Sequence, residues 1–150
     1  LRRQRQMCIR DRSCSVLSPL RDSYDDLNDS SLVLRVTYGE HTILFTGDAE
    51  QETEQDLLNA YPAAKLQATV LKVGHHGSST STSESFLNAV APRVCVISCG
   101  KNNDYGHPHM ETRDRIDAIH AQMYRTDLQG TITITFDRTD FVVQTARDEN

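Results

Sequence analysis

Short β-rich runs alternate with helical stretches along most of this 150-residue chain, and this alternation limits its fold more than any other feature. Two apolar runs, at 31–39 and 41–47, meet at Gly39 and Glu40 and predict a β-hairpin. The remaining pattern predicts helices at 50–60, 84–90 and 111–121, and strands at 68–73, 94–98, 123–126, 131–136 and 141–145. The order of these elements predicts an α/β fold in which helices pack on a mixed sheet.

The composition is that of one globular domain. The chain is 37% hydrophobic and 25% charged, which excludes disordered, collagen-like and disulfide-scaffold classes. Its apolar runs are far shorter than the roughly 20 residues of a membrane helix, so we expect no membrane span in this chain. The chain has four cysteines, which are too few for a disulfide framework: Cys8, Cys14, Cys95 and Cys99. We interpret Cys95 and Cys99 as buried thiols, with a redox pair as the less favoured alternative.

Residues 1–18 differ from the rest of the chain because they lack strand or helix periodicity. Residues 1–12 hold five Arg and one Asp, and the run QMCIRDR resembles a translated sequencing adapter. We therefore expect 1–18 to be a non-native or disordered leader and 19–150 to be the domain. An ordinary basic tail and a nucleic-acid-binding arm are the alternatives.

The charge of the rest of the chain bears on its partners. Residues 13–150 carry 11 basic and 20 acidic side chains, so a broad basic surface for nucleic acid is excluded. Any role with nucleic acid must therefore depend on a metal site.

Three polar clusters follow predicted strands, where α/β folds place reactive groups. They are TGD at 46–48, GHHGS at 74–78 and YGHPH at 105–109. Each joins glycine to a carboxylate or imidazole that can bind Zn²⁺ or Mn²⁺. The candidate site residues are Asp48, His75, His76 and His107.

Each cluster also has a structural interpretation. Asp48 could cap the helix that follows it, and the adjacent histidines could be solvent-exposed loop residues. His107 could orient a turn before Pro108. The other histidines are expected at the surface: His41, His109 and His120.

Taken in order, the three motifs resemble the C-terminal half of a metallo-β-lactamase-fold hydrolase domain of ComEC-type competence proteins and their stand-alone relatives. The resemblance runs from about 28 to 145. It implies half of a four-layer αβ/βα sandwich with a two-metal site at one edge. Asn28 and Ser31 match the NxxS opening of that half.

The resemblance also implies roles for individual residues. Asp48 corresponds to the carboxylate that bridges the two metal ions. Either His75 or His76 completes the coordination of one ion, with the other behind it. His107 lies at the mouth of the site, beside the scissile phosphate or ester.

The chain departs from the family pattern because neither HxHxDH nor HxDxDH, which supply most of the metal ligands, occurs in it. We therefore expect a partial domain that is inactive alone and whose sheet exposes an apolar face.

For the intact protein the resemblance implies a metal-dependent hydrolase with two divalent ions, Zn or Mn. A metal-bound hydroxide would attack a phosphodiester or related ester of a phosphorylated substrate, with DNA during uptake as one candidate. The parent protein would be a membrane-embedded competence channel or a stand-alone secreted enzyme, so we expect the cell envelope or the extracellular space rather than the cytoplasm. The alternative is a non-catalytic binding or structural module. The upstream sequence would separate the two, because only the enzyme requires the missing motif.

Overall fold

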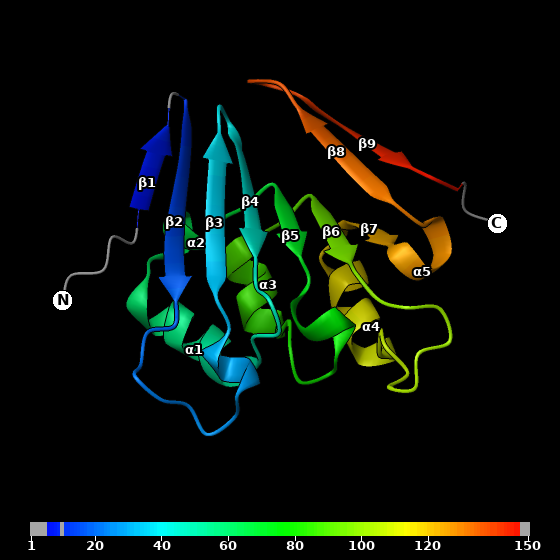
Figure 1. The fold of residues 1–150 in the computed structure, drawn as a ribbon, viewed down its shortest axis with the longest axis horizontal. Helices are drawn as coiled ribbons and strands as arrows, with labels where there is room; N and C mark the ends of the chain where they lie inside the picture. The colour runs from blue at the N-terminus through cyan, green and yellow to red at the C-terminus, as the bar shows by residue number, and fades with distance from the viewer. Residues whose placement is uncertain (1–5, 10, 148–150) are drawn as a thin grey trace.

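The centre of the fold is a mixed sheet with strand order β1-β2-β3-β4-β5-β6-β7 (Figure 1). The computed structural model describes residues 6–9 and 11–147. Neighbouring strands from β1 to β4 are antiparallel, and those from β4 to β7 are parallel. The strands are β1 (Gln6–Ile9), β2 (Arg12–Ser18), β3 (Val33–Tyr38), β4 (His41–Phe45), β5 (Val70–Lys72), β6 (Val94–Ile97) and β7 (Gln122–Arg125).

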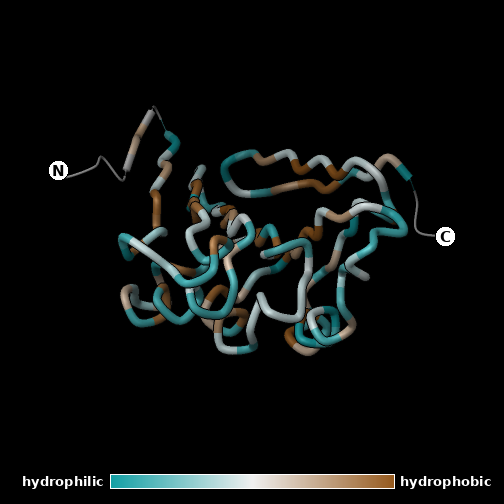
Figure 2. Tube along the Cα trace, turned by 60° about the horizontal axis from the view of Figure 1, so that its bottom comes forward, coloured by the Kyte–Doolittle hydropathy of each residue, from teal (hydrophilic) through white to brown (hydrophobic). Residues whose placement is uncertain are grey.

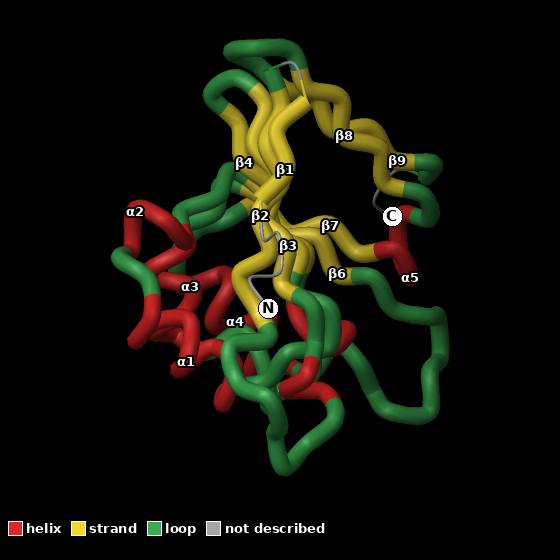
Figure 3. The backbone as a smooth tube through the Cα atoms, turned by 60° about the vertical axis from the view of Figure 1, so that its left-hand side comes forward, coloured by secondary structure: helices red, strands yellow, loops and turns green. Residues whose placement is uncertain are grey.

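Helices cover one face of this sheet, and a separate hairpin lies over the other (Figure 3). The helices on the first face are α1 (Gln51–Ala60), α2 (Ala63–Leu66), α3 (Glu84–Val90) and α4 (Met110–Ala118). The hairpin consists of β8 (Ile132–Phe136) and β9 (Phe141–Thr145), and it is joined to β7 through α5 (Thr126–Gln129). The predicted α/β class with a mixed sheet and helices is confirmed.

The core lies between the sheet and the helices. Leu44, Leu71 and Ile97 point from neighbouring strands toward Leu57 of α1 and Phe86 of α3, and all five side chains are buried. Alternate residues of a strand face opposite sides of a sheet, so these positions select the face on which the helices pack. The brown apolar stretches in Figure 2 lie largely along the strands and the hairpin, whereas the connecting loops are mostly teal.

The opposite face of the sheet is also apolar, as expected, but it is partly covered. Ile132, Ile134 and Phe136 of β8 lie across from Ile43 and Val96, and a cavity of about 220 Å³ separates the two layers. The cover is incomplete at the edges, since Phe45 remains 41% exposed and Leu32 51% exposed.

The expectation that residues 1–18 are a disordered leader is wrong for the described part of that segment. β1 pairs with β2, and β2 pairs with β3 from Arg12 to Ser18. Leu17 is only 1% exposed, because it faces the helix layer from β2. The sheet therefore begins before residue 19. Residues 1–5 and 10 lie outside the described residues, and the foreign origin of the segment stays a prediction.

The other predicted elements are present with shifted ends. The third helix ends at Ala118 rather than at 121, because His120 has a positive φ of 57° that a right-handed helix excludes. The short helices α2 and α5 were not predicted. Within the described chain, no helix has the length and apolarity needed to cross a membrane.

Candidate functional site

Loops that follow β4, β5 and β6 bring the predicted residues together at the carboxyl ends of the parallel strands. Nε2 of His76 lies 3.5 Å from Oδ1 of Asp48. The ring of His107 lies 5.5 Å from the ring of His75 and 6.5 Å from that of His76, measured between centroids. All four candidates therefore belong to one cluster, although they are up to 59 positions apart in the sequence.

The histidine pair sits in a strained turn. His75 and His76 have φ of 41° and 55° within the 3₁₀ turn η2 (Gly74–Gly77). Left-handed backbone is uncommon for residues with a side chain and persists only where surrounding contacts enforce it. One such contact is the hydrogen bond from the amide of His75 to the carbonyl oxygen of Gly47, 3.1 Å long, which joins this turn to the TGD loop.

Gly77 joins the histidine turn to the third loop. A Cβ atom at this position would lie 2.6 Å from Cβ of Pro108, so only glycine permits the approach. The amide of His109 donates to the carbonyl oxygen of Gly77 at 2.9 Å. The glycine of the second motif and the proline of the third thus pack directly on each other.

The NxxS motif holds the loop that carries Asp48. Oγ of Ser31 accepts a hydrogen bond from the amide of Asp48 at 3.1 Å. The side-chain amide of Asn28 donates to Oε1 of Glu50 at 3.2 Å. Asn28 begins the 3₁₀ turn η1 (Asn28–Ser30) and Ser31 directly follows it, so this turn fixes the backbone around the carboxylate.

The alternative that Asp48 caps α1 is wrong. The N-cap residue is Glu50, and its side chain makes no cap hydrogen bond. The capping acceptor is instead Asp29, whose Oδ1 accepts from the amides of Glu50 at 3.1 Å and Thr53 at 3.0 Å. Asp48 is therefore free of this structural task and points toward His76.

Glu50 also lies in this cluster, although the sequence did not single it out as a candidate. Its Oε1 lies 2.7 Å from Nδ1 of His75, although this nitrogen has no partner in hydrogen-bond geometry. Its position two residues after Asp48 of the TGD motif is the one feature of the sequence that points to a place near the site. The pattern predicts Glu50 only as the first residue of the helix at 50–60.

His109 was expected at the surface, yet it holds two loops together. Its Nδ1 accepts from the amide of Ser79 at 2.9 Å, so Nε2 carries the proton and donates to the carbonyl oxygen of Tyr105 at 3.1 Å. His41, which was expected at the surface, is instead only 5% exposed between the rings of Phe136 and Phe141, so that expectation is wrong. His120 is exposed, as expected.

The surroundings of His107 favour its neutral form. Partial burial lowers the pKa of His107 below its ordinary value, and the neighbouring His109, His75 and His76 lower it further. Asp48 acts in the opposite direction and is the weakest of these influences. His107 therefore carries a neutral imidazole near pH 7.

The donor atoms suit a metal ion in type and partly in geometry. Nδ1 of His76 lies 2.6 Å from the carbonyl oxygen of Ser98, which can only accept, so Nε2 keeps a lone pair that faces Asp48. The 3.5 Å between Nε2 of His76 and Oδ1 of Asp48 is close to the roughly 3.3 Å that separates neighbouring tetrahedral zinc ligands with bonds of about 2 Å. The number of donors is insufficient, because no three His, Cys, Asp or Glu side chains of residues 6–9 and 11–147 are arranged to hold an ion.

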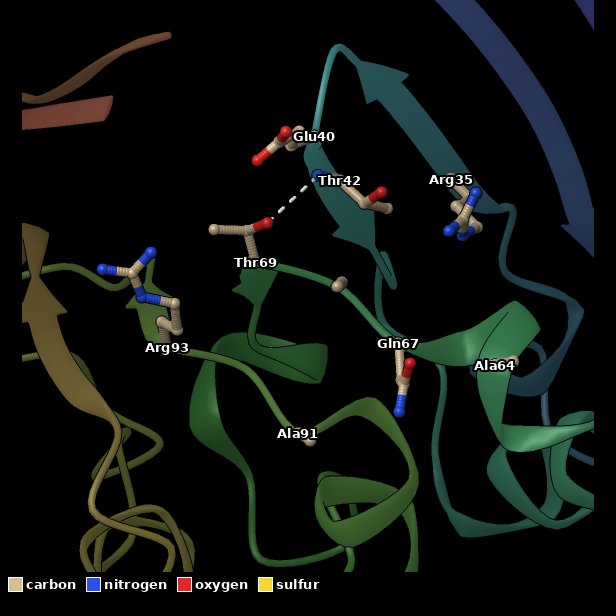
Figure 4. A pocket seen from close by; sticks show the side chains of 9 residues that line it. Arg35, Glu40, Thr42, Ala64, Gln67, Thr69, Ala91 and Arg93 are labelled. Atoms are coloured by element: carbon tan, nitrogen blue, oxygen red, sulfur yellow. Dashed lines mark hydrogen bonds between the residues drawn. The ribbon is translucent and has the colours of Figure 1, made fainter. Parts of the chain in front are cut away.

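A separate cavity of about 370 Å³ lies at the opposite, amino ends of the parallel strands (Figure 4). Thr42, Thr69 and Arg93, near the starts of β4, β5 and β6, contribute to its lining. None of the predicted site residues borders it.

Comparisons with known proteins agree with the motifs. The family model described as the metallo-beta-lactamase superfamily matches residues 21–101. The chain is 43% identical to ComE operon protein 3 of Bacillus subtilis (strain 168) over 83% of this chain and 16% of the relative. It is 43% identical to competence protein ComA of Neisseria gonorrhoeae over 75% of this chain and 16% of the relative. Recombination protein 2 of Haemophilus influenzae is 38% identical over 80% of this chain and 15% of its own length.

These similarities confirm the resemblance to ComEC-type competence proteins. The chain spans about 16% of the length of the first two relatives. On the family match and the site motifs together, the chain belongs to the metallo-beta-lactamase superfamily.

Proposed function

We propose that this domain contributes part of the active site of a metal-dependent hydrolase that cleaves phosphodiester or related ester bonds. The observation that carries the proposal is the 3.5 Å contact between Oδ1 of Asp48 and Nε2 of His76, at an edge where three loops meet. In this proposal the remaining ligands come from an HxHxDH or HxDxDH segment outside the chain, and the chain alone is inactive.

His76, rather than His75, is the proposed metal ligand. The bond from its Nδ1 to the carbonyl oxygen of Ser98 fixes both the ring and its tautomer, as in metal-binding histidines whose second nitrogen donates to the protein. His75 lies behind it, with Nδ1 beside Glu50. Asp48 is the proposed bridging carboxylate.

Two divalent ions, Zn²⁺ or Mn²⁺, would lower the pKa of a bound water and neutralise negative charge on the substrate. Among the residues of this chain, His107 is the proposed contact to the phosphate or ester. As a neutral imidazole it can donate a hydrogen bond from one nitrogen to a phosphate oxygen without carrying a charge of its own. Asn28 and Ser31 act as positioning residues for Asp48 and Glu50.

DNA is the proposed substrate of the intact protein, in keeping with relatives that are named for competence and recombination. The net charge of -5 argues against a basic groove in this domain, so the site itself would have to engage the phosphate. The cell envelope is the proposed location. Phosphorylated small molecules and surface polymers are the alternative substrates, and the same metal-bound hydroxide would cleave them.

The test is hydrolysis of bis(p-nitrophenyl) phosphate by the intact protein, with Zn²⁺ or Mn²⁺ supplied. Asp48→Ala should reduce the rate by at least about a hundredfold, since a bridging carboxylate serves both ions. Asp114→Ala, which removes an exposed carboxylate of α4, is the matched control and should retain the wild-type rate. An unchanged rate in Asp48→Ala would exclude this site and favour a non-catalytic module.

A further inference from the structure

Three rings at the mouth of the site form a nearly parallel series. The rings of His76 and His107 are inclined by 18° with centroids 6.5 Å apart, and those of His107 and Tyr105 by 21° with centroids 5.7 Å apart. These distances fit offset stacking. The series ends at Tyr105, which is 78% exposed, so the phenol ring remains largely open to solvent.

The loop that carries Tyr105 is held on both sides. The side chain of Asn103 accepts from the amide of His107 at 2.9 Å and donates to the carbonyl oxygen of the same residue at 2.6 Å. On the other side, His109 donates to the carbonyl oxygen of Tyr105 at 3.1 Å. The backbone that presents the ring is therefore organised before any ligand binds, which reduces the entropy lost on binding.

We propose that Tyr105 is a stacking subsite for a nucleobase of the substrate, an inference that rests on the proposed function of the adjacent site. In a nucleotide the base is covalently close to its phosphate, so a phosphate beside His107 places its base within reach of Tyr105. An exposed aromatic ring binds any base by its π-face, without sequence preference.

This subsite defines the class of substrate. A base inside a duplex is already stacked on both faces, whereas a base in a single strand is free to stack on protein. The subsite therefore selects single-stranded nucleic acid over phosphodiesters that lack a base. It also provides affinity that does not depend on a basic surface, which matters in a chain with net charge -5.

The experiment compares two ligands that differ only in the base: deoxyadenosine 5′-monophosphate and 2-deoxyribose 5-phosphate. Each is titrated into the chain while the aromatic signals of labelled tyrosines are followed by NMR. The ring signals of Tyr105 should move upfield with the nucleotide, and the nucleotide should bind at least about fivefold more tightly than the sugar phosphate. Tyr105→Ala should abolish this preference, and Tyr105→Phe should retain it. Val142→Ala, which trims another exposed apolar side chain, should leave it unchanged.

Equal binding of the two ligands, no binding of either, or a preference that survives Tyr105→Ala would overturn the stacking subsite. None of these readouts requires turnover. If the wild-type chain shows no preference for the nucleotide while the intact protein hydrolyses the phosphodiester in an Asp48-dependent way, the subsite alone is overturned. A Tyr105-dependent preference in a protein whose intact form hydrolyses nothing would support the subsite and contradict the proposed function.

Discussion

Nδ1 of His76 lies 2.6 Å from the carbonyl oxygen of Ser98, so the peptide that follows β6 determines which nitrogen of His76 faces Asp48. His75, one position earlier, directs its Nδ1 toward Glu50 at 2.7 Å instead. Two adjacent histidines of one motif therefore have different surroundings, and these predict different responses to substitution.

His76→Ala should weaken Zn²⁺ binding by the chain at least about tenfold, because it removes the nitrogen that is oriented toward Asp48. His75→Ala is the matched control and should have a smaller effect. Competition with a chromogenic chelator measures both affinities. A larger loss in His75→Ala would reverse the assignment of the two histidines.

Leu17→Ala should destabilise the fold by about 2–5 kcal/mol, the usual cost of a large cavity in a core. Leu17 is 1% exposed on β2, whereas Leu27 is 88% exposed in the loop that precedes β3. Leu27→Ala should therefore change the free energy of unfolding by less than about 0.5 kcal/mol. Urea denaturation compares the two variants, and equal stabilities would mean that β2 does not belong to the cooperative core.

Glu54 is buried in α1 and accepts hydrogen bonds from the amides of Thr82 and, at 2.9 Å, Ser83. Glu54→Ala leaves both amides without this partner and should cost about 2–4 kcal/mol of unfolding free energy. Glu54→Gln keeps one acceptor and should cost less. Urea denaturation of the two variants measures the difference, and a wild-type midpoint for Glu54→Ala would contradict this role.

Burial raises the pKa of Glu54 above its ordinary value of 4.5, against the opposing effect of its hydrogen bonds to Ser83 and Thr82. The folded state therefore binds this proton more tightly than the unfolded state, and the stability that the proton contributes is lost as pH rises through the folded pKa. The stability of the wild type relative to Glu54→Gln should fall as pH is raised from about 4 to about 7. Denaturation midpoints across this interval test the sign, and a relative stability that rises with pH would contradict it.

Cys99 is a shielded thiol whose Sγ lies 3.2 Å from Oδ1 of Asp127. Burial, and after it the nearby carboxylate of Asp127, together raise the pKa of Cys99 to about 11. Asp127→Asn should lower this pKa and accelerate alkylation of Cys99 by iodoacetamide near pH 8, because the thiolate is the reactive form. Mass spectrometry follows the rate, with Cys95, whose pKa is raised to about 12 by burial alone, as the internal reference. An unchanged rate for Cys99 would contradict the influence of Asp127.

The sequence predicted the elements whose periodicity is long enough to be recognised. The strands β3, β4 and β6 and the helices α1 and α3 lie close to their predicted ranges. The helices α2 and α5 have four residues each, about one turn, and so short a segment has no recognisable 3.6-residue period. β2 was missed because Arg-rich and Ser-rich surroundings conceal its single strongly apolar inward residue, Leu17.

The site was predictable at the level of its motifs, since Asp48, His75, His76 and His107 do meet. The contacts between side chains were not. Glu50 contacts His75, 25 positions away in the sequence, and His109 contacts Ser79, 30 positions away. Only the folded chain brings the members of each pair together. The capping role that was the structural alternative for Asp48 belongs to Asp29, which lies 24 residues before Thr53 in the sequence.

The most direct measurement of the central claim is the paramagnetic broadening caused by Mn²⁺ in the ¹⁵N-labelled chain. If Asp48 and His76 share a metal ion, substoichiometric Mn²⁺ should first broaden the amide signals of residues 47–48, 75–77 and 107, and Asp48→Ala should remove this pattern. The exposed acidic residues Asp22, Asp25 and Asp26 provide a built-in competitor for non-specific binding. Broadening centred on 22–26, or a pattern that persists unchanged in Asp48→Ala, would contradict the assignment of a metal site to Asp48 and His76.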